Sequence, residues 1–409
     1  MKARKAALVF ILITVSLDMI ALGIIIPVLP KLILNFLGGS TARAATWVGI
    51  FGTVFALMQF VFSPVLGVVS DRVGRRPVIL LSNVGLGLDY IVMALAPTIG
   101  WLFLGRIISG ITAASITTAM AYISDVVVPE KRAGAFGLIG AAFGLGFIIG
   151  PALGGWLGAV DPRLPFWVAG GLSLVNAAYG FLVLPESLGT EKRRAFSFRR
   201  ANPVGSLVLL RSHPELSRLA VIQFISYTAH EVVQVYVLYV IYRYLWNEKT
   251  IGLSLAFVGI CTVIISGGMV RPVVARLGER RALYLGQALG AIGMLLMGWG
   301  TTAFIFMIGV TVMNLWSLAG PAAQGMMTHR VGASEQGELQ GAISSLRAIA
   351  MLIGPGLFSF TFAWSINPAH GWKIPGVPWY LAAAMLFLAM LLAFTVEQPA
   401  MTPAAAPAE

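Results

Sequence analysis

Three acidic residues, Asp18, Asp89 and Glu231, lie deep inside long apolar stretches of this sequence. A charge at the centre of a bilayer costs roughly 2.5–3.5 kcal/mol on insertion scales, so an acidic residue there is seldom incidental. A carboxyl group in such a place can bind a proton or a cationic ligand and release it again. We therefore predict that these three residues couple the movement of a ligand to that of protons. The alternative for each is a structural pair with a nearby cation or hydroxyl group.

Two arginines, Arg106 and Arg347, also lie within apolar stretches. Arg106 is predicted to belong to the proton-coupling group by organising the carboxylates, with helix packing as the alternative. Arg347 is either a counter-ion in a central cavity or a side chain that extends to the membrane interface. His230 adjoins Glu231, but consecutive residues of a helix point about 100° apart, so only one of the two need face a cavity.

Other polar side chains in the apolar stretches can also form hydrogen bonds, although contacts between helices are their ordinary role. The predicted substrate-binding set consists of Asp18, Gln59, Asp89, His230, Glu231, Gln234, Asn314 and Arg347. Cys261 is the only cysteine, and no cluster has metal-ligand spacing, so we expect no disulfide and no metal. The sequence contains no Walker-type phosphate loop and no nucleophile–base arrangement. We therefore expect no cofactor, no ATP-driven step and no enzymatic activity.

The elements that must position these residues are helices that cross a membrane. The chain has 409 residues, of which 58% are hydrophobic and 11% charged, and its mean hydropathy is +0.87. Soluble domains contain about 25% charged residues. A run of about 20 apolar residues crosses a hydrocarbon core of roughly 30 Å. Twelve spans are predicted: 7–28, 46–66, 78–97, 101–123, 134–159, 164–184, 218–240, 250–272, 282–299, 303–327, 338–362 and 377–396.

Basic residues are distributed unevenly between the loops that join these spans. If the N-terminus is cytoplasmic, 20 of the 28 Lys and Arg residues fall on the cytoplasmic side, six fall outside and two lie within spans. This asymmetry fits the positive-inside rule and accounts for the net charge of +12 without a nucleic-acid partner. We predict a multi-pass protein of the bacterial inner membrane with both termini in the cytoplasm.

Several features recur in the chain at a displacement of 204 residues. Gly150-Pro151 recurs as Gly354-Pro355, and the Arg-x-Gly sequence at 72–74 recurs at 276–278. Internal repeats of this kind are typical of secondary transporters, whose binding site lies near the bilayer midplane between the repeats. The predicted organisation is a six-helix half over 1–184, a cytoplasmic linker over 185–217, a second six-helix half over 218–396 and a disordered tail over 397–409.

Three motifs in the first half resemble those of the major facilitator superfamily. They are GVVSDRVGRRP at 67–77, LGRIISG at 104–110 and GLGFIIGPALGG at 144–155, the last of which resembles the superfamily's antiporter motif. The predicted gating residues are Gly67, Asp71, Arg72, Gly74, Arg75, Arg76 and Asp125, where charge pairs would hold the cytoplasmic gate closed. The predicted antiporter-motif residues are Gly146, Gly150, Pro151, Gly154 and Gly155, whose small size lets helices approach closely.

The chain also resembles the tetracycline efflux family of drug:proton antiporters along most of its length. The resemblance rests on LDMIALGIIIPVLP at 17–30, GLDY at 87–90, TIGLSLA at 250–256, ARLGERRAL at 275–283 and QGELQG at 336–341. It implies an all-α membrane protein with the major facilitator fold, in which twelve transmembrane helices form two six-helix halves. It also implies export of drugs in exchange for protons.

The sequence departs from that family at two positions. Tetracycline pumps carry an aspartate in span nine where this chain has Gly290, and a histidine in span eight where it has Cys261-Thr262. We therefore hypothesise that Glu231 takes over part of the role of the span-nine acid. The resemblance supports the scaffold and proton coupling, but it does not identify tetracycline as the substrate.

The leading functional prediction is a secondary transporter that exports small organic molecules in exchange for protons. One alternative is a gradient-coupled transporter of a specific endogenous metabolite, and another is a membrane sensor or structural protein. We expect a monomer whose partners are a small organic substrate, protons and the lipid bilayer.

Overall fold

The computed structural model describes residues 2–113, 115–193, 205–211, 214–332, 334–371 and 373–396. The predicted tail over 397–409 and much of the predicted linker over 185–217 lie outside these ranges. The described part of the linker contains two short 3₁₀ helices, η1 (Thr190–Lys192) and η3 (Gly205–Arg211).

The first six spans are built from eight helices. They are α1 (Lys2–Ile25), α2 (Leu29–Phe36), α3 (Thr41–Val73), α4 (Arg75–Leu95), α5 (Ile99–Thr112), α6 (Ser115–Val126), α7 (Pro129–Val160) and α8 (Leu164–Val183). α1 and α2 together form span one, and α5 and α6 together form span four.

The last six spans contain more interruptions. Their elements are α9 (Pro214–His230), η4 (Glu231–Val235), α10 (Tyr236–Tyr244), α11 (Glu248–Ile264), η5 (Ile265–Met269), α12 (Val270–Leu277), α13 (Glu279–Trp299), α14 (Ala303–Asn314), η6 (Leu315–Leu318), α15 (Ala319–Thr328), α16 (Gln336–Ser365), η7 (Pro368–His370) and α17 (Val377–Phe394).

Twelve helical segments of the described chain are long and apolar enough to cross a membrane, and each overlaps one predicted span. The prediction of twelve spans is therefore confirmed. Several helices extend well beyond the predicted apolar stretch, as in span two, which runs over Thr41–Val73. Polar residues continue the helix there because its hydrogen bonds join backbone groups and do not depend on apolar side chains.

Three of the last six spans change their helical geometry near their middle. Span seven passes through a 3₁₀ segment at Glu231–Val235, span eight through a π-helical segment at Ile265–Met269, and span ten through a 3₁₀ segment at Leu315–Leu318. Such local changes expose backbone groups and are frequent at functional sites. In transporters, discontinuous helices typically surround the binding site.

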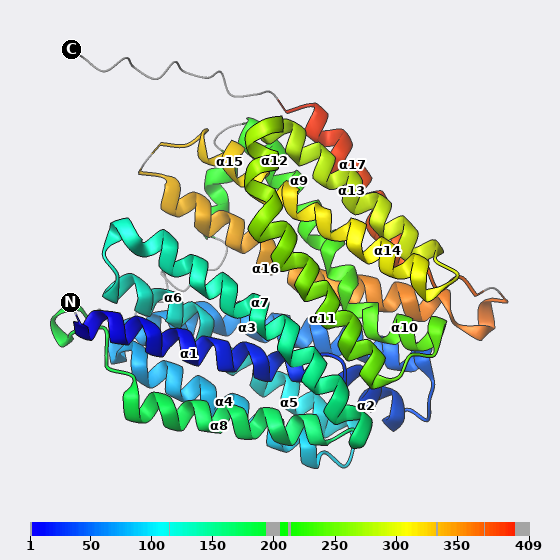
Figure 1. Ribbon diagram of the computed structural model, residues 1–409, viewed down its shortest axis with the longest axis horizontal. Helices are drawn as coiled ribbons and strands as arrows, with labels where there is room; N and C mark the ends of the chain where they lie inside the picture. The colour runs from blue at the N-terminus through cyan, green and yellow to red at the C-terminus, as the bar shows by residue number, and fades with distance from the viewer. Residues whose placement is uncertain are drawn as a thin grey trace.

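The first six spans form one group of helices and the last six spans form a second group. The two groups meet along two seams (Figure 1). In the first group α1 packs on α7 and α8, and α4 packs on α8; in the second α13 packs on α14 and α17. The seams are α7 against α11 and α3 against α16. Figure 1 shows the groups diverging towards the side where the N-terminus lies. The exact boundaries predicted for the two halves and the linker stay a prediction.

Glycines show where along the seams the groups touch. A Cβ atom added at Gly155 would lie 2.8 Å from Gly252 Cα, and one added at Gly52 would lie 2.6 Å from Pro355 Cβ. Further along α7, Gly140 and Gly137 have nothing within 4 Å of the equivalent position. We call the end of the helices that carries Gly74 and Gly278 the basic end, and the opposite end the far end. The groups are thus in contact towards the far end and apart towards the basic end.

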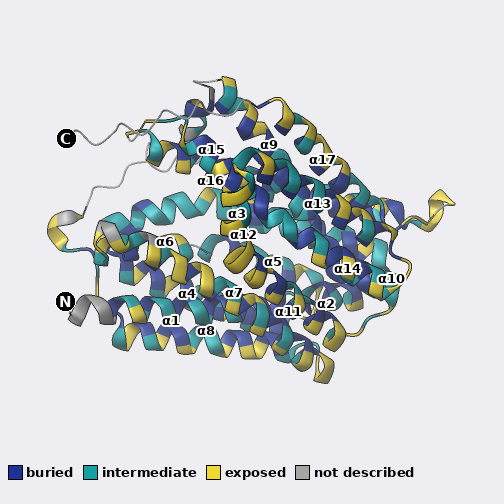
Figure 2. Cartoon of the chain, turned by 45° about the horizontal axis from the view of Figure 1, so that its top comes forward, coloured by how far each residue is buried: buried dark blue, intermediate teal, exposed yellow. Residues whose placement is uncertain are grey.

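The outer surface of both groups is apolar. Val160, Leu182, Phe304 and Leu245 are among the large apolar side chains that are more than two-thirds exposed: 72%, 80%, 74% and 86%. Figure 2 shows buried residues where helices face one another and exposed residues on the outward faces. A soluble monomer rarely exposes so much apolar surface, whereas a lipid-facing surface requires it.

Candidate functional site

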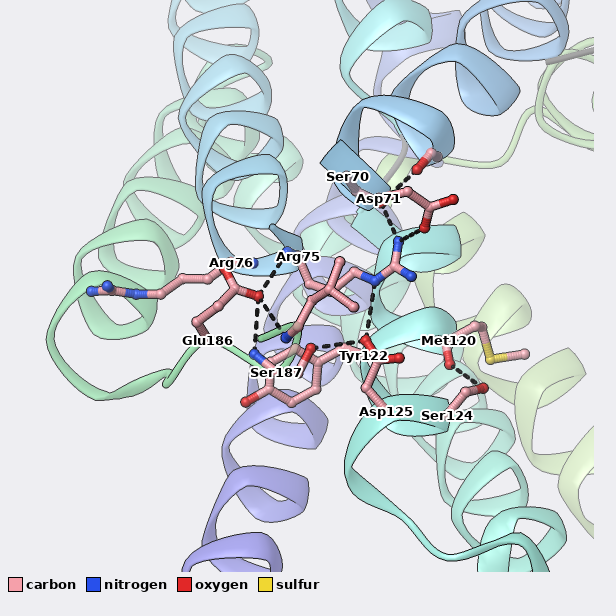
Figure 3. A network of polar contacts seen from close by, with 12 residues as sticks. Ser70, Asp71, Arg75, Arg76, Met120, Tyr122, Ser124, Asp125, Glu186 and Ser187 are labelled. Carbon is pink, nitrogen blue, oxygen red and sulfur yellow. Dashed lines mark hydrogen bonds and ion pairs between the residues drawn. The ribbon is translucent and has the colours of Figure 1, made fainter. Parts of the chain in front are cut away.

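A network of polar contacts surrounds Arg75 at the basic end of the first group (Figure 3). Its Nη1 atom lies 2.6 Å from Asp71 Oδ1 and donates to Ser70 Oγ at 2.6 Å, while its Nε donates to Asp125 Oδ2 at 3.1 Å. The planar guanidinium can satisfy these acceptors together because its donors are fixed in a fork. The predicted gating residues Asp71, Arg75 and Asp125 are therefore adjacent.

Glu186, which lies beyond the end of α8, completes this network. Its carboxylate accepts the backbone N–H groups of Arg75 at 2.9 Å and Arg76 at 3.3 Å, so it caps the first turn of α4. Gly74 has φ +114°, and a Cβ atom there would collide with the Glu186 carboxylate. Only glycine fits this turn. The sequence prediction missed Glu186, although an acidic residue after a span that returns to the same membrane face was a possible signal.

The remaining predicted gating residues have different surroundings. Arg76 donates to the carbonyl oxygen of Phe181 and stacks on its ring, whereas Arg72 is exposed. A Cβ atom at Gly67 would meet nothing within 4 Å. In the second group Arg280, displaced by 204 residues from Arg76, donates to the carbonyl of Phe394 at 2.7 Å.

The ion pairs at Arg75 join helices of the first group to one another. They exist while the two groups are apart at the basic end, so in this state they are not a contact between the groups. Among the described residues, the side-chain partners of Arg75 come from α3 and α6 of its own group. The gating role of these residues stays a prediction.

Asp18 lies among the amide side chains of two neighbouring helices. Asn176 of α8 donates to Asp18 Oδ1 at 2.8 Å and to the Thr14 carbonyl at 2.9 Å. The Asn83 amide of α4 lies 3.1 Å from both carboxylate oxygens and donates to them when its nitrogen faces Asp18. Asp18 is only 5% exposed. The two asparagines belong to the first group, which supports the alternative of a structural contact.

Asp89 and Arg106 lie between α3, α4 and α5. Ser109 donates a hydrogen bond to Asp89 Oδ2, and Asp89 is fully buried. The Arg106 guanidinium carbon lies 4.3 Å from the centre of the Phe55 ring, a cation–π contact. Within the described chain no ion pair joins Asp89 and Arg106, although the charge of each acts on the other. Gly105 permits this approach, because a Cβ atom there would lie 2.6 Å from Asp89 Oδ1.

A polar and aromatic cluster lies in the second group. The His230 and Trp316 rings are stacked, with centroids 4.8 Å apart and planes 17° apart. Trp316 Nε1 donates to Gln287 Oε1 at 3.2 Å, and Gln287 Nε2 donates to Ser226 Oγ at 2.6 Å. The ring of Trp316 is therefore held in one orientation. His230 was predicted from the sequence as a substrate-binding residue, whereas Gln287 and Ser226 were not.

Trp316 also occupies the space beside Gly290. A Cβ atom at Gly290 would lie 3.0 Å from both Cβ and Cδ1 of Trp316 and 2.8 Å from Leu386 Cδ1. The aspartate expected at this position from the family resemblance has no room here unless these neighbours move.

Glu231 lies where α9 ends and η4 begins, against Gly354 of α16. The space that a Cβ atom at Gly354 would fill is occupied by Cβ and Cγ of Glu231. Gln234 Nε2 lies 3.4 Å from Glu231 Oε2, and the charge of Arg347 acts on both Glu231 and His230. η4 contacts α16 and also α3 of the first group. These four predicted residues are thus brought together where the groups meet.

The other predicted substrate-binding residues lie apart from this cluster. Asn314 accepts a hydrogen bond from Thr262 at 2.8 Å, which joins spans eight and ten. Gln59 is half-buried on α3 and forms no side-chain hydrogen bond with the described part of the chain. The binding role of each stays a prediction.

The antiporter-motif residues fall into two sets on α7. Added Cβ atoms at Gly146, Gly150 and Gly154 would meet the backbone of α1, so these glycines permit close packing inside the first group. Gly155 instead faces Gly252 of α11, and a Cβ atom at Gly252 would meet the carbonyl oxygen of Pro151. This second set forms part of the seam between the groups.

Twelve spans, discontinuous helices and charged groups at a seam between two helical groups define a membrane transporter. The family model of the Major Facilitator Superfamily matches residues 11–355 and 219–409, and the chain belongs to this superfamily. Its members are transporters rather than enzymes, and they carry small organic substrates across membranes. The major facilitator fold predicted from the sequence is confirmed.

Curated relatives cover almost the whole chain. The chain is 35% identical over 391 residues to the tetracycline resistance protein, class C, of Escherichia coli, covering 95% of this chain and 96% of that protein. It is 33% identical over 401 residues to the class D protein of Salmonella ordonez, covering 97% and 98%. The resemblance to tetracycline efflux proteins is therefore confirmed.

Solved structures share the fold at lower identity. The human organic anion transporter MFSD10 (TETRAN) aligns with a TM-score of 0.69 at 23% identity, covering 95% of this chain and 99% of that one. The nucleoside transporter NupG aligns with a TM-score of 0.74 at 12% identity, covering 95% and 98%.

Proposed function

We propose that this protein exports small organic molecules across the bacterial inner membrane in exchange for protons, with both termini in the cytoplasm and as a monomer. The names of the curated relatives support export of a drug-like substrate. The separation of the two groups at the basic end gives such a substrate a path from the predicted cytoplasmic side.

The observation that carries the proposal is the position of Glu231. It lies at a change of helical geometry, beside the Gly354-Pro355 repeat, on a segment that contacts both groups. A carboxyl group at the seam can hold either a proton or a cationic part of the substrate. Because a protonated carboxyl no longer attracts a cation, protons and substrate compete for it, and this competition is the basis of exchange.

The acids of the first group take a supporting part in the proposal. Asp89 is close enough to Arg106 for their charges to interact, and both belong to the proposed coupling group. Asp18, which is held by amides, supports the packing of α1 on α4 and α8 and contributes to coupling through that packing.

The test uses purified protein in proteoliposomes with an imposed pH gradient. Glu231→Gln is expected to reduce gradient-driven export to the level of protein-free liposomes. Counterflow at saturating substrate concentration, which needs no net proton movement, should persist. Glu338→Gln is the matched control, because Glu338 is an exposed acid near the basic end of α16. Normal gradient-driven export by Glu231→Gln would show that Glu231 is structural.

A second candidate is a gradient-coupled transporter of one endogenous metabolite. The contact between Trp316 and Gly290 favours it, since that contact removes a position characteristic of tetracycline pumps. A thermal-shift screen that includes drugs and metabolites separates the two: stabilisation by one metabolite class alone supports this candidate, and stabilisation by several unrelated drugs supports the exporter.

A further inference from the structure

We infer that the cluster of His230, Glu231, Gln234, Trp316 and Arg347 binds a planar aromatic zwitterion, whose anionic group pairs with Arg347 and whose cationic group pairs with Glu231. The inference rests on the proposed function and adds the chemical class of its substrate. It depends on three features of the cluster: a free cation, an acid that is not paired with it, and an aromatic wall between polar groups.

Arg347 supplies the cation. It lies 11 residues from the start of α16, about 17 Å along the helix axis, and its side chain is exposed. Among the described residues it forms no hydrogen bond or ion pair, although its charge acts on His230, Glu231 and Tyr227. An unpaired guanidinium in a membrane span is costly. Its planar fork of donors fits a carboxylate or a similar planar anion.

Glu231 supplies the anion at a separate point of the same cluster. Its described hydrogen bond is a long one from Gln234 at 3.4 Å, and it forms no ion pair with Arg347 within the described chain. Arg347 lies seven residues before Gly354, which packs against Glu231, so the two positions share one face of α16 and are about 10 Å apart along the helix axis. A ligand that carries both charges can bridge the two groups. A ligand of a single charge would leave one of the two side chains without a partner.

Trp316 and His230 supply the apolar wall. Their rings are parallel within 17°, and both side chains are only partly buried. Trp316 Nε1 donates to Gln287 Oε1 at 3.2 Å, which fixes the ring, so the wall is preformed. A flat aromatic ligand can lie against such a surface with little loss of conformational freedom, whereas a branched aliphatic ligand makes fewer contacts.

The zwitterion also agrees with exchange against protons. A proton on Glu231 removes the partner of the ligand's cation and leaves Arg347 unchanged, so protonation weakens binding. For a purely anionic ligand the effect has the opposite sign, because loss of the negative charge on Glu231 would favour an anion at Arg347. The charged or titratable groups that act on one another here are Glu231, His230, Tyr227 and Arg347.

The test is isothermal titration of the full chain in nanodiscs near neutral pH with three probes of one shape. The first is an aminomethyl-substituted naphthoate, which is a zwitterion, and the second is its methyl ester, which keeps only the cation. The third is the ring-methylated naphthoate, in which a methyl group replaces the aminomethyl group and only the anion remains. The zwitterion is expected to bind at least about tenfold more tightly than either analogue, because it alone makes both charge-assisted contacts.

Variants assign each contact. Arg347→Gln should lower the affinity for the zwitterion to that for the ester and leave the ester unchanged, while Arg347→Lys should retain part of the preference. Glu231→Gln should lower the affinity for the zwitterion to that for the ring-methylated naphthoate. Trp316→Leu should weaken all three probes alike. Melting curves of each variant establish that it is folded.

Three results would overturn the inference: equal affinities for the three probes, an equal loss of zwitterion and ester in Arg347→Gln, or no binding of the zwitterion at millimolar concentration. Proton-driven drug export measured in the same preparation separates this inference from the proposed function. If export persists without a preference for the zwitterion, the function stands and the substrate class is wrong. If the preference holds without proton-driven export, the reverse is true.

Discussion

Gly155→Ala is predicted to open the far end of the protein. Gly155 of α7 and Gly252 of α11 are in contact across the seam between the two groups. A transporter that releases its substrate at the far end must separate these helices there. A methyl group at position 155 therefore disfavours the state described above and leaves the opposite state unaffected.

The size of the effect follows from the geometry. The added methyl carbon would collide with the backbone carbonyl oxygen of Glu248 and would lie 2.8 Å from Gly252 Cα, whereas ordinary carbon–carbon contacts are about 3.5 Å or longer. The helices must move apart by at least about 0.7 Å, and the obstacle is backbone, which cannot rotate away. Overpacking of this kind costs roughly 1–3 kcal/mol, which shifts the ratio of the two states by roughly 5- to 150-fold.

The assay follows the reactivity of a thiol buried in the other seam. Ser359 of α16 is fully buried and faces Gly49 of α3, so Ser359→Cys in a Cys261→Ser background introduces one nearly isosteric reporter. Its labelling by a soluble maleimide in purified protein should become faster in Gly155→Ala by the factor given above, because labelling requires the far end to open.

Gly140→Ala is the matched control. Gly140 lies on the same helix and has nothing within 4 Å of its Cβ position, so this variant gains the same helix propensity without the contact. If both variants label at the same rate, or if Gly155→Ala labels no faster than the parent, the α7–α11 contact does not control opening of the far end.

Three further outcomes are expected. Gly290→Asp should lower the melting temperature of the solubilised protein, because the side chain clashes with Trp316 and buries a carboxylate. Adding Trp316→Ala should recover part of this loss, whereas additive losses in the double variant would contradict the contact. Gly74→Ala, at φ +114° and against the Glu186 carboxylate, should destabilise the basic end by roughly 1–3 kcal/mol. The loss should be seen as earlier proteolysis at the turn between α3 and α4, and wild-type protection would refute the strain. Thr190→Cys in intact cells should react only with membrane-permeant reagents; labelling from outside would reverse the proposed topology.

Much of the fold followed from the sequence because hydropathy is a property of contiguous residues. All twelve spans were found by their apolar runs. The geometry changes at Glu231–Val235 and Leu315–Leu318 were not found, since neither segment contains proline. Such changes depend on contacts with neighbouring helices, and a single segment of sequence does not specify those contacts.

The candidate site was predicted less completely. Residue type identified Asp71, Arg75 and Asp125 as ionic partners, and the structure brings them together. It did not identify Glu186, whose carboxylate reaches the start of α4 at the basic end although it follows α8 in the sequence. Three membrane acids were given similar roles, yet Asp18 is enclosed by amides and Glu231 lies at the seam.

The sequence by itself determined the membrane-spanning class, the twelve spans, the superfamily and the side chains able to carry a charge into the bilayer. These depend on composition, local motifs and the cost of burying charge, and each can be evaluated along the chain. Only the tertiary structure decided which partner each of these side chains has. Trp316 stacks on His230 and fills the space beside Gly290. Glu231 packs against Gly354, on the helix that carries Arg347. These contacts bring together residues that are distant in sequence. Such pairings depend on how helices cross and rotate against one another, which no single segment specifies.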